Sequence, residues 1–276
     1  TEAVMKAWKE RNWSWDIDGI SLHYYTVGGW PAKYKATGFG EEEYAKLLKE
    51  TVRMDELIRL HGAIMDKYDP EKKIALVVDE WGAWLEQTPG TKDGFLEQQN
   101  SQRDAIIAAL NINTFARHAD RVRMANIAQM VNVLQAMLLT DNEKLVKTPT
   151  YHVFRMYVPF QDSTFVPIQF DGQTYRYGDI ELPRLDAIAA KDKDGKTWIA
   201  IANVDPKRPA RIRVATTGQK SVNLRGETLV APRIDSVNTF DAPNTVVPKP
   251  ISGKRSGNAT TLELAPASVT VVSFTP

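Results

Sequence analysis

Two adjacent acidic residues stand at a position where acid–base or nucleophilic chemistry could take place. Asp79 and Glu80 directly follow the apolar run IALVV at residues 74–78. An uninterrupted apolar run of this kind predicts a strand of a parallel sheet that is buried on both faces. The strand is expected to end at the DEW sequence, residues 79–81. The reactive groups of barrels and open α/β sheets lie where such strands end. The alternative is an ordinary charged strand end that leads into a solvated loop.

A histidine and two tyrosines end the strand that we predict at residues 17–25. Because side chains alternate along a strand, His23 and Tyr25 are expected on one side and Tyr24 on the other. Next to an acidic residue from the following strand, an imidazole and a phenol would form a hydrogen-bonded polar cluster. Taken alone, a histidine at a strand end is more often a structural hydrogen-bonding group than a catalyst.

Ligand-binding side chains are predicted around these strand ends. Trp81 and Trp84 could form a wall on which a sugar stacks, or raise the pKa of a carboxyl group by excluding water. In the region of the third strand, Asn126, Gln129 and Asn132 interrupt an apolar stretch, and each could contact a hydroxyl-rich ligand. They could equally cap or bridge the backbone, which is the favoured interpretation for the two asparagines.

No metal, phosphate or cofactor site is expected from the sequence. The other histidines are His61, His118 and His152. They form no H-x-x-x-H or H-E-x-x-H pair. Asp192 and Asp194 before Gly195 resemble a fragment of a calcium loop, but the downstream glutamate is missing, and a plain turn is predicted. The sequence also lacks a phosphate-binding glycine fingerprint and the G-x-S-x-G pattern of a nucleophile elbow.

The elements that must position these residues alternate between strands and helices up to about residue 160. Strands are predicted at 17–25, at 74–78 and around 121–127. A helix that starts at three glutamates, 41–43, and ends before Pro70 separates the first two strands. A second helix at roughly 94–118 precedes the third strand. This order predicts βαβ units and a parallel sheet.

Beyond residue 160 the helical patterns disappear and short β-rich runs follow. They lie at residues 197–203, 210–215, 221–224 and 268–274, with turns at 193–195 and 217–218. These runs predict an antiparallel β-sandwich, with a long proline-containing loop at 232–258. The chain is therefore predicted to have an α/β domain at 1–160 and an all-β domain at 161–276.

The composition is that of an ordinary globular chain. Of its 276 residues 43% are hydrophobic and 25% charged, which excludes a disordered tail or a collagen-like chain. The 35 Lys and Arg against 34 Asp and Glu leave a net charge of +1, so neither a nucleic-acid partner nor a membrane surface is expected. The absence of cysteine excludes disulfides, zinc–thiolate sites and a thiol nucleophile. The first ten residues have the pattern of a helix interior, so the chain is expected to start inside a domain.

Four segments of the sequence resemble the C-terminal part of glycoside hydrolase family 51 α-L-arabinofuranosidases. They are DGISLHYYT at 18–26, LVVDEWGAW at 76–84, ANIAQMVNVLQAML at 125–138 and LAPASVTVVSF at 264–274. The resemblance covers essentially the whole chain in order, and DEWGAW after an apolar strand is fairly specific. It implies the second half of a (β/α)8 TIM barrel followed by a jelly-roll-like β-sandwich.

The same resemblance implies roles for individual residues. Glu80 matches the catalytic nucleophile of a retaining double-displacement reaction, and Tyr25 matches a tyrosine that hydrogen-bonds this nucleophile. His23, Trp84 and Gln129 match residues that bind the sugar. The implied reaction is exo-acting and releases terminal arabinofuranose from arabinoxylan, arabinan or arabino-oligosaccharides, without a metal or organic cofactor. Two alternatives stay open: another retaining glycosidase of the same barrel type that acts on a xyloside or glucan, and a non-catalytic carbohydrate-binding protein.

One departure from the family pattern concerns the general acid/base. In the family this residue is a glutamate that follows an asparagine at the end of the fourth barrel strand. The only Asn-Glu pair here is Asn142-Glu143, in a predicted loop after the third strand. Three or four strands cannot close a barrel, so we expect a separate chain to supply the N-terminal half of the barrel together with the acid/base. The resemblance also implies a cytoplasmic homo-oligomer.

Overall fold

The first part of the fold is a parallel sheet with helices between its strands. The computed structural model describes residues 1–10, 16–215 and 222–275. The elements up to the third strand are α1 (Glu2–Lys9), β1 (Gly19–Thr26), α2 (Glu41–Tyr68), β2 (Ala75–Ala83), α3 (Gln102–Arg117) and β3 (Val122–Ile127). β2 pairs in parallel with β1 on one side and with β3 on the other. The predicted alternation of strands and helices is therefore confirmed.

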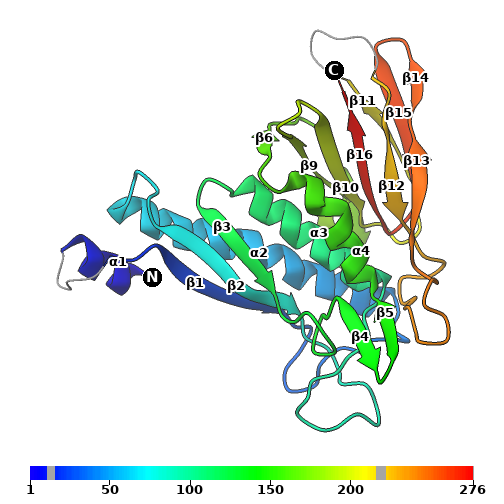
Figure 1. The fold of residues 1–276 in the computed structure, drawn as a ribbon, viewed down its shortest axis with the longest axis horizontal. Coiled ribbons are helices and arrows are strands. Elements are labelled where there is room, and N and C mark those ends of the chain that lie inside the picture. Colours follow the sequence, from blue (N-terminus) through cyan, green and yellow to red (C-terminus); the bar gives the residue numbers. More distant parts are fainter. Residues whose placement is uncertain (11–15, 216–221, 276) are drawn as a thin grey trace.

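The helices α2 and α3 pack against this sheet (Figure 1). α2 buries one stripe of side chains at helical spacing, made of Tyr44, Ala45, Leu47, Leu48, Thr51, Met54, Ile58 and Met65. α3 is buried along most of its length. The predicted start of α3 near Gly94 is wrong, since the helix begins at Gln102. The reason is a capping box, in which Ser101 and Asp104 satisfy each other's backbone N–H groups.

The strand β2 does not end at the acidic pair, as the sequence pattern predicts, but continues to Ala83. β1 pairs with it over this extension, as far as Thr26 opposite Ala83. The Trp81 indole is fully buried, with its ring centroid 5.2 Å from that of Phe115 and 6.0 Å from that of Phe154. Strand pairing and burial of this indole together explain why β2 continues past Asp79 and Glu80.

After β3 the chain forms hairpins, a short helix and two antiparallel sheets. The elements are β4 (Leu138–Asp141), β5 (Lys144–Lys147), α4 (Pro149–Tyr157), the 3-10 helix η1 (Val158–Phe160), β6 (Thr164–Val166), β7 (Thr174–Tyr177), β8 (Ile180–Pro183), β9 (Leu185–Lys191), β10 (Thr197–Asn203), β11 (Ala210–Val214), β12 (Arg225–Leu229), β13 (Pro248–Ser252), β14 (Lys254–Ser256), β15 (Ala259–Leu264) and β16 (Ser268–Phe274). The larger sheet has the order β13-β12-β16-β10-β9-β6 and the smaller one β11-β15-β14. Their strands pair antiparallel, in agreement with the sequence prediction.

The larger antiparallel sheet has an apolar core on each face. On β10, Ala200 and Ala202 belong to the main core, which the sheet shares with α2 and α3. Ile199 and Ile201, which alternate with them, face a second core shared with β15 of the smaller sheet. The layers thus run from the parallel sheet through the helices to the larger and then the smaller antiparallel sheet (Figure 1).

Two predictions for the antiparallel part are wrong. The strand predicted at 221–224 begins only at Arg225, as β12, and residue 221 lies outside the described residues. The region 232–258 is not a single loop, because it contains β13 and β14. The turn predicted at 193–195 is present, with Gly195 at a φ of +82°, whereas the turn predicted at 217–218 lies outside the described residues.

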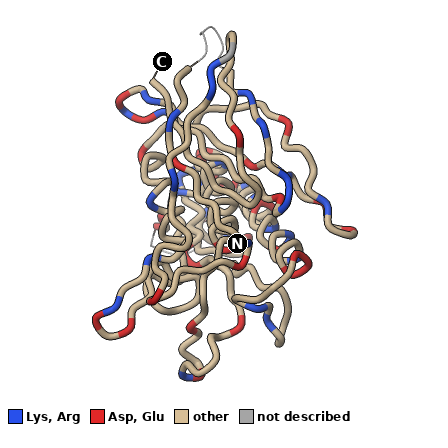
Figure 2. The backbone as a smooth tube through the Cα atoms, turned by 90° about the vertical axis from the view of Figure 1, so that its right-hand side faces the viewer, with Lys and Arg blue, Asp and Glu red and all other residues tan. Residues whose placement is uncertain are grey.

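Charged residues of both signs are interspersed along the backbone (Figure 2). Among the helices that the structure describes, none is both long enough and apolar enough to cross a membrane.

Candidate active site

An extra residue in β2 turns both carboxylates of the acidic pair towards β1. Ser21 lies opposite Val77 and His23 lies opposite Glu80, so that two steps along β1 match three along β2. The pairing of β2 with β3 shifts over the same stretch. A bulge of this kind re-aims side chains. In a regular strand Asp79 and Glu80 would point to opposite faces, whereas here both reach His23.

Five side chains form one hydrogen-bonded cluster at this bulge, which we call the bulge cluster: Ser21, His23, Tyr25, Asp79 and Glu80. Nε2 of His23 lies 2.8 Å from Oδ1 of Asp79, and Nδ1 of the same ring lies 2.9 Å from Oε2 of Glu80. The Ser21 hydroxyl donates to Oδ1 of Asp79 over 2.8 Å. The Tyr25 hydroxyl donates to Oε1 of Glu80. The structure therefore brings together His23, Tyr25 and Glu80, as expected from the strand ends.

The bulge cluster lies on the face of the parallel sheet opposite α2. Tyr24, between His23 and Tyr25, points the other way, and its hydroxyl donates to the backbone carbonyl of Glu50 in α2 over 2.8 Å. Burial, assisted by the charge of Glu50, raises the pKa of Tyr24 to about 12. The Glu80 side chain is 37% exposed and that of His23 52%. The predicted alternation is confirmed, and the bulge cluster is accessible from solvent.

Tyr25 is a firm hydrogen-bond donor to Glu80. Burial raises the pKa of the Tyr25 hydroxyl well above its ordinary value, and the hydrogen bond to Glu80 and the charge of that carboxylate raise it further. The hydroxyl therefore keeps its proton at neutral pH. Oε1 of Glu80 accepts this hydrogen bond, and its other oxygen, Oε2, lies 2.9 Å from Nδ1 of His23.

An aromatic surface adjoins the bulge cluster. The ring of Trp84 packs edge-on against Tyr25, with centroids 5.3 Å apart, and Trp30 packs edge-on against Trp84 at 5.9 Å. The ammonium group of Lys33 lies 4.9 Å from the Trp30 centroid and 4.8 Å from that of Trp84. Trp30 is 72% exposed. This surface offers aromatic area next to Glu80 on which the apolar face of a sugar could stack.

Sequence reasoning missed three of these neighbours. Ser21 stands two residues before His23, so the alternation of the strand could have placed it on the same face. Trp30 and Lys33 lie in the loop between β1 and α2, where no spacing rule connects a residue to a strand end.

The polar residues around the end of β3 have different surroundings from one another. Gln129 is exposed and follows β3 by two residues, without a hydrogen bond to any residue that the structure describes. Asn126 is exposed on β3 itself. Asn132 binds the backbone of Thr140 in both directions, at 2.7 Å and 3.2 Å, so for this residue the backbone-bridging alternative is confirmed.

Two of the remaining histidines and the aspartate of the predicted turn have structural partners. His118 lies 2.8 Å from a carboxylate oxygen of Asp55, and His61 lies 2.6 Å from the hydroxyl of Thr1. Asp192 accepts backbone N–H groups within its own turn, as expected of a plain turn. Within the described ranges, no group of three or more His, Asp or Glu side chains is arranged to hold a metal ion.

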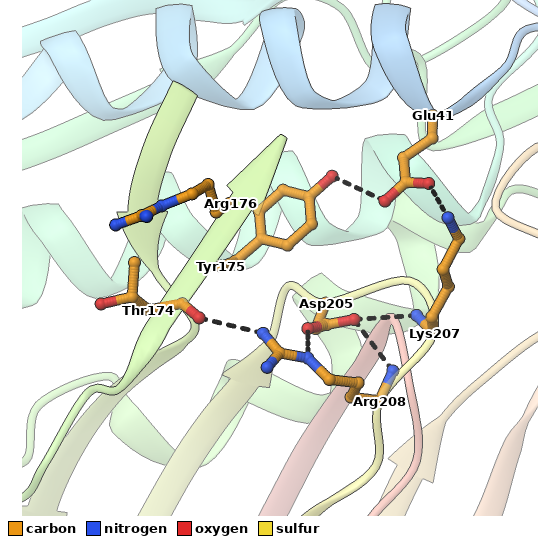
Figure 3. A pocket seen from close by; sticks show the side chains of 7 residues that line it. All are labelled: Glu41, Thr174, Tyr175, Arg176, Asp205, Lys207 and Arg208. Atoms are coloured by element: carbon orange, nitrogen blue, oxygen red, sulfur yellow. Dashed lines mark hydrogen bonds and ion pairs between the residues drawn. The ribbon is translucent and has the colours of Figure 1, made fainter. Parts of the chain in front are cut away.

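A separate pocket of about 400 Å³ lies between α2, the β7–β8 hairpin and the connection after β10 (Figure 3). It is lined by Glu41, Thr174, Tyr175, Arg176, Asp205, Lys207 and Arg208. Four of its charged groups are paired with one another, Lys207 with Glu41 and Arg208 with Asp205, while Arg176 is paired with Glu181 of β8. The Tyr175 hydroxyl donates to Glu41 over 3.3 Å.

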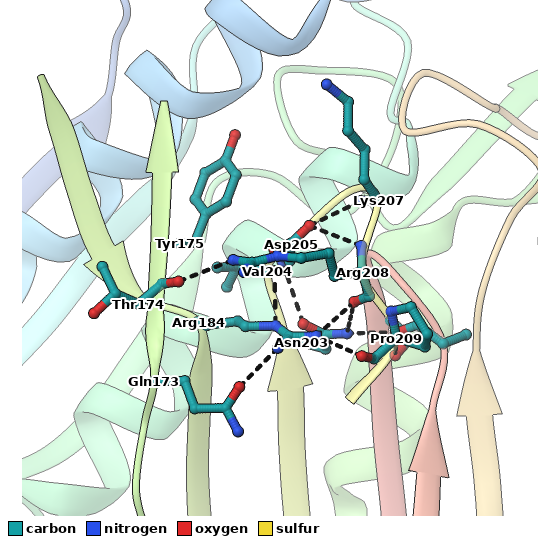
Figure 4. A network of polar contacts seen from close by, with 12 residues as sticks. Gln173, Thr174, Tyr175, Arg184, Asn203, Val204, Asp205, Lys207, Arg208 and Pro209 are labelled. Carbon is teal, nitrogen blue, oxygen red and sulfur yellow. Dashed lines mark hydrogen bonds and ion pairs between the residues drawn. The ribbon is translucent and has the colours of Figure 1, made fainter. Parts of the chain in front are cut away.

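Arg184 extends this set of contacts into the antiparallel sheets (Figure 4). Its guanidinium donates to Oε1 of Gln173 over 2.7 Å and to the backbone carbonyl of Arg208 over 2.9 Å. Asn203 donates to the same carbonyl over 3.0 Å. Because most of the polar groups in this set bind one another, we assign the pocket a structural role, in which it joins α2 to the antiparallel part.

Known proteins that are similar to this chain match a region that includes Asp79 and Glu80. The family model described as "Alpha-L-arabinofuranosidase C-terminal domain" matches residues 79–268. The intracellular exo-α-L-arabinofuranosidase of Bacteroides ovatus is 42% identical over 253 residues, which are 91% of this chain and 49% of that protein. An intracellular exo-α-(1→5)-L-arabinofuranosidase of Bifidobacterium longum is 26% identical, over 91% of this chain and 50% of its own length.

Solved structures of arabinofuranosidases share the fold. The crystal structure of the GH51 arabinofuranosidase from Xanthomonas axonopodis pv. citri superposes with a TM-score of 0.94 at 47% identity, covering 99% of this chain and 55% of its own. This chain spans about half the length of the relatives that it matches. Since the family model matches well over half of the residues, the chain belongs to the α-L-arabinofuranosidase C-terminal domain family, as the C-terminal part of a family 51 glycoside hydrolase.

Proposed function

We propose that this chain carries the nucleophile side of the active site of a retaining, exo-acting α-L-arabinofuranosidase, with Glu80 as the nucleophile. The observation that carries the proposal is the position of Glu80 on the accessible face of the sheet, where Tyr25 and His23 each contact one of its oxygens. These two contacts favour the ionised carboxylate that a nucleophile requires. The names of the relatives, which are exo-α-L-arabinofuranosidases, support the choice of the sugar.

The reaction proceeds in two displacements. Glu80 attacks the anomeric carbon of a terminal arabinofuranose, and the bond from that carbon to the leaving oxygen breaks while a general acid donates a proton to the oxygen. The covalent arabinosyl ester at Glu80 is then attacked by water, from which the same acid/base residue removes a proton. Arabinose leaves with retained configuration and Glu80 is regenerated. No metal or organic cofactor enters this scheme.

The sugar would be held by the residues around Glu80. Trp84 offers its ring as a wall beside the bulge cluster, and His23 and Gln129 offer polar groups for the sugar hydroxyls. We assign Tyr25 to holding Glu80 in position and ionised. The substrates that we propose are arabinoxylan, arabinan and arabino-oligosaccharides with terminal arabinofuranose.

The general acid/base belongs to the part of the enzyme that precedes this chain in its relatives. We propose that residues 1–160 form the second half of a (β/α)8 barrel and residues 161–276 a jelly-roll-like β-sandwich. An N-terminal half from another chain would complete the barrel, and the complete enzyme would be a homo-oligomer. The names of the relatives also support a cytoplasmic location.

The experiment that tests the proposal is covalent labelling of the complete enzyme with an arabinofuranose-configured mechanism-based inactivator. We expect intact-mass spectrometry to detect one added glycosyl group, and peptide mapping to locate it on Glu80. The Glu80→Ala variant should stay unlabelled, while Glu143→Ala should be labelled like the wild type. A label on another carboxylate would remove the assignment of Glu80. Faster hydrolysis of an aryl xyloside than of an aryl arabinofuranoside would instead identify a different retaining glycosidase.

A further inference from the structure

The imidazole of His23 lies between two carboxylates that come from consecutive residues. Its Nε2 faces Oδ1 of Asp79 at 2.8 Å and its Nδ1 faces Oε2 of Glu80 at 2.9 Å. An ionised carboxylate only accepts hydrogen bonds, and a neutral imidazole donates through one nitrogen alone. Both contacts are therefore hydrogen bonds only if both ring nitrogens carry a proton, or if one of the carboxyl groups does.

The other partners of the carboxylates decide between these two cases. Oδ1 of Asp79 faces Nε2 of His23 and also accepts the hydroxyl proton of Ser21. Oε1 of Glu80 accepts the hydroxyl proton of Tyr25, while Oε2 faces Nδ1. Each carboxylate therefore already accepts a hydrogen bond from a hydroxyl group, which favours the ionised form of both acids. The second proton accordingly belongs on the imidazole.

We infer that Asp79 is a positioning residue, which holds His23 as a doubly protonated imidazolium so that a positive charge stands against the nucleophile Glu80. The inference rests on the proposed function of Glu80. It gives a specific role to Asp79, which the sequence pattern marked only as one member of an acidic pair and which the relatives' names do not mention. Asp79 acts through His23, because the bulge directs its carboxylate to the far side of the ring from Glu80.

The charges that surround His23 are consistent with this arrangement. On β2 it faces the two carboxylates, and on its own strand Ser21 and Tyr25 are uncharged donors to them. In the adjoining loop, the ammonium group of Lys33 lies over the rings of Trp30 and Trp84. With an imidazolium between them, the two carboxylates are separated by a positive charge instead of repelling each other directly.

The variant Asp79→Asn tests the charge of His23 separately from the geometry of the bulge cluster. An asparagine amide can donate a hydrogen bond to Nε2, so His23 then needs only one proton, on Nδ1, to keep its hydrogen bond to Glu80. We therefore expect the contacts of the bulge cluster to persist while the positive charge is lost at neutral pH. Asp179→Asn, an exposed change in the β7–β8 turn, is the matched control.

The first measurement counts protons on the ring directly, in the complete enzyme with 15N-labelled histidine. Comparison with His23→Gln assigns the signals of His23. Near pH 7.5 we expect the wild type to show the 15N shifts of two protonated ring nitrogens. In Asp79→Asn we expect the shifts of one protonated and one unprotonated ring nitrogen. A wild-type His23 with a single ring proton overturns the inference, whether or not Glu80 is the nucleophile. The wild-type proton count needs only the assignment from His23→Gln, so it decides the inference even if Asp79→Asn fails to fold.

The second measurement follows the rate at which the inactivator labels Glu80, because labelling needs the nucleophile. We expect Asp79→Asn to slow labelling about tenfold or more near pH 7.5, with little change in the inactivator concentration for half-maximal rate. The deficit should shrink towards pH 5, where the single remaining carboxylate partner is enough to keep His23 protonated. A loss of the same size at every pH would indicate a purely structural role and overturn the inference. If the inactivator does not label the wild-type enzyme, the proposed function itself is contradicted. The proton count on His23 does not depend on that function, so the two failures can be told apart.

Discussion

The hydroxyl of Tyr25 donates its proton to Oε1 of Glu80 across the β1–β2 pair, although 55 positions separate the two residues in the sequence. Parallel pairing with a bulge in β2 makes this contact possible, because it sets His23 opposite Glu80, and Tyr25 is the next residue of β1 on the same face as His23. The rigid sheet thus fixes the direction of the carboxylate before any substrate is present. Such preorganisation is what a nucleophile needs, since it lowers the cost of reaching the attacking geometry.

Replacing Glu80 should remove catalysis. In the complete enzyme we expect Glu80→Ala to lower kcat on an aryl arabinofuranoside at least about a thousandfold, because no covalent intermediate can form. Glu143→Ala, in the exposed turn between β4 and β5, should change kcat by less than about twofold. Steady-state kinetics on both variants is the measurement. Turnover by Glu80→Ala at the wild-type rate would exclude Glu80 as the nucleophile.

Replacing Tyr25 should cost less than replacing Glu80. Tyr25→Phe keeps the ring against Trp84 but removes the donor to Oε1, and a hydrogen bond to a charged group contributes about 1.5–3 kcal/mol. We expect kcat to fall by roughly ten- to hundredfold, with a smaller change in KM. A variant with a normal kcat and a raised KM would assign Tyr25 to sugar binding instead.

The positions of the candidate residues could be predicted from the sequence because they depend on local rules. Strand alternation put Tyr24 on the helix side and His23 and Tyr25 on the other, as the structure has them. The apolar run at 74–78 predicted the central strand. The bulge was not predictable, because it is a property of the register between β2 and its two neighbours and not of either sequence alone. For that reason the joint approach of Asp79 and Glu80 to one imidazole emerged only in the structure.

The prolines between residues 232 and 258 misled the prediction for a related reason. Pro248 and Pro250 suggested a loop, yet both belong to β13. β13 is an edge strand of the larger sheet and pairs on one side only, with β12. A proline is tolerated in an edge strand where its missing N–H would face outward. Whether a strand lies at an edge is decided by the sheet as a whole and is not visible in its local sequence.

The contact between α2 and the antiparallel part should depend on Asp205. Its side chain is 4% exposed and accepts the backbone N–H groups of Lys207 and Arg208, at 2.9 Å each, and the guanidinium of Arg208 at 2.5 Å. Burial acts to raise the pKa of Asp205, but these hydrogen bonds and the positive charge outweigh burial and hold the pKa below 3.8. A folded-state pKa below the unfolded value means that the carboxylate stabilises the fold above about pH 4 and loses this effect as the pH falls.

We therefore expect Asp205→Asn to lower the free energy of unfolding by about 1–3 kcal/mol at neutral pH. The difference from the wild type should shrink below about pH 4, where the wild-type carboxyl group also becomes protonated. Urea denaturation at several pH values measures this, and Asp179→Asn is the exposed control. Equal stability of Asp205→Asn and wild type at pH 7 would mean that the network in Figure 4 contributes little.

A buried histidine should make the fold sensitive to acid. His152 in α4 is 8% exposed, and neither ring nitrogen has a hydrogen-bond partner in the described part of the chain. Burial lowers its pKa from 6.5 to about 4, and the positive charges of Arg155 and Lys147 contribute in the same direction. Between these two pH values the unfolded chain binds a proton that the folded chain does not, so stability falls as the pH is lowered through this range.

The size of this effect follows from the difference in pKa. The lowering of the pKa from 6.5 to about 4 corresponds to at most about 3 kcal/mol of stability lost between pH 6.5 and pH 4. His152→Phe keeps an aromatic ring at the site and removes the titrating group, so we expect its free energy of unfolding to fall less steeply over this interval. Urea denaturation of both proteins across the same pH series isolates the contribution of His152, because the titration of the carboxylates is common to both. Parallel stability curves for the two proteins would show that the histidine ring is already reached by water or a proton in the folded state.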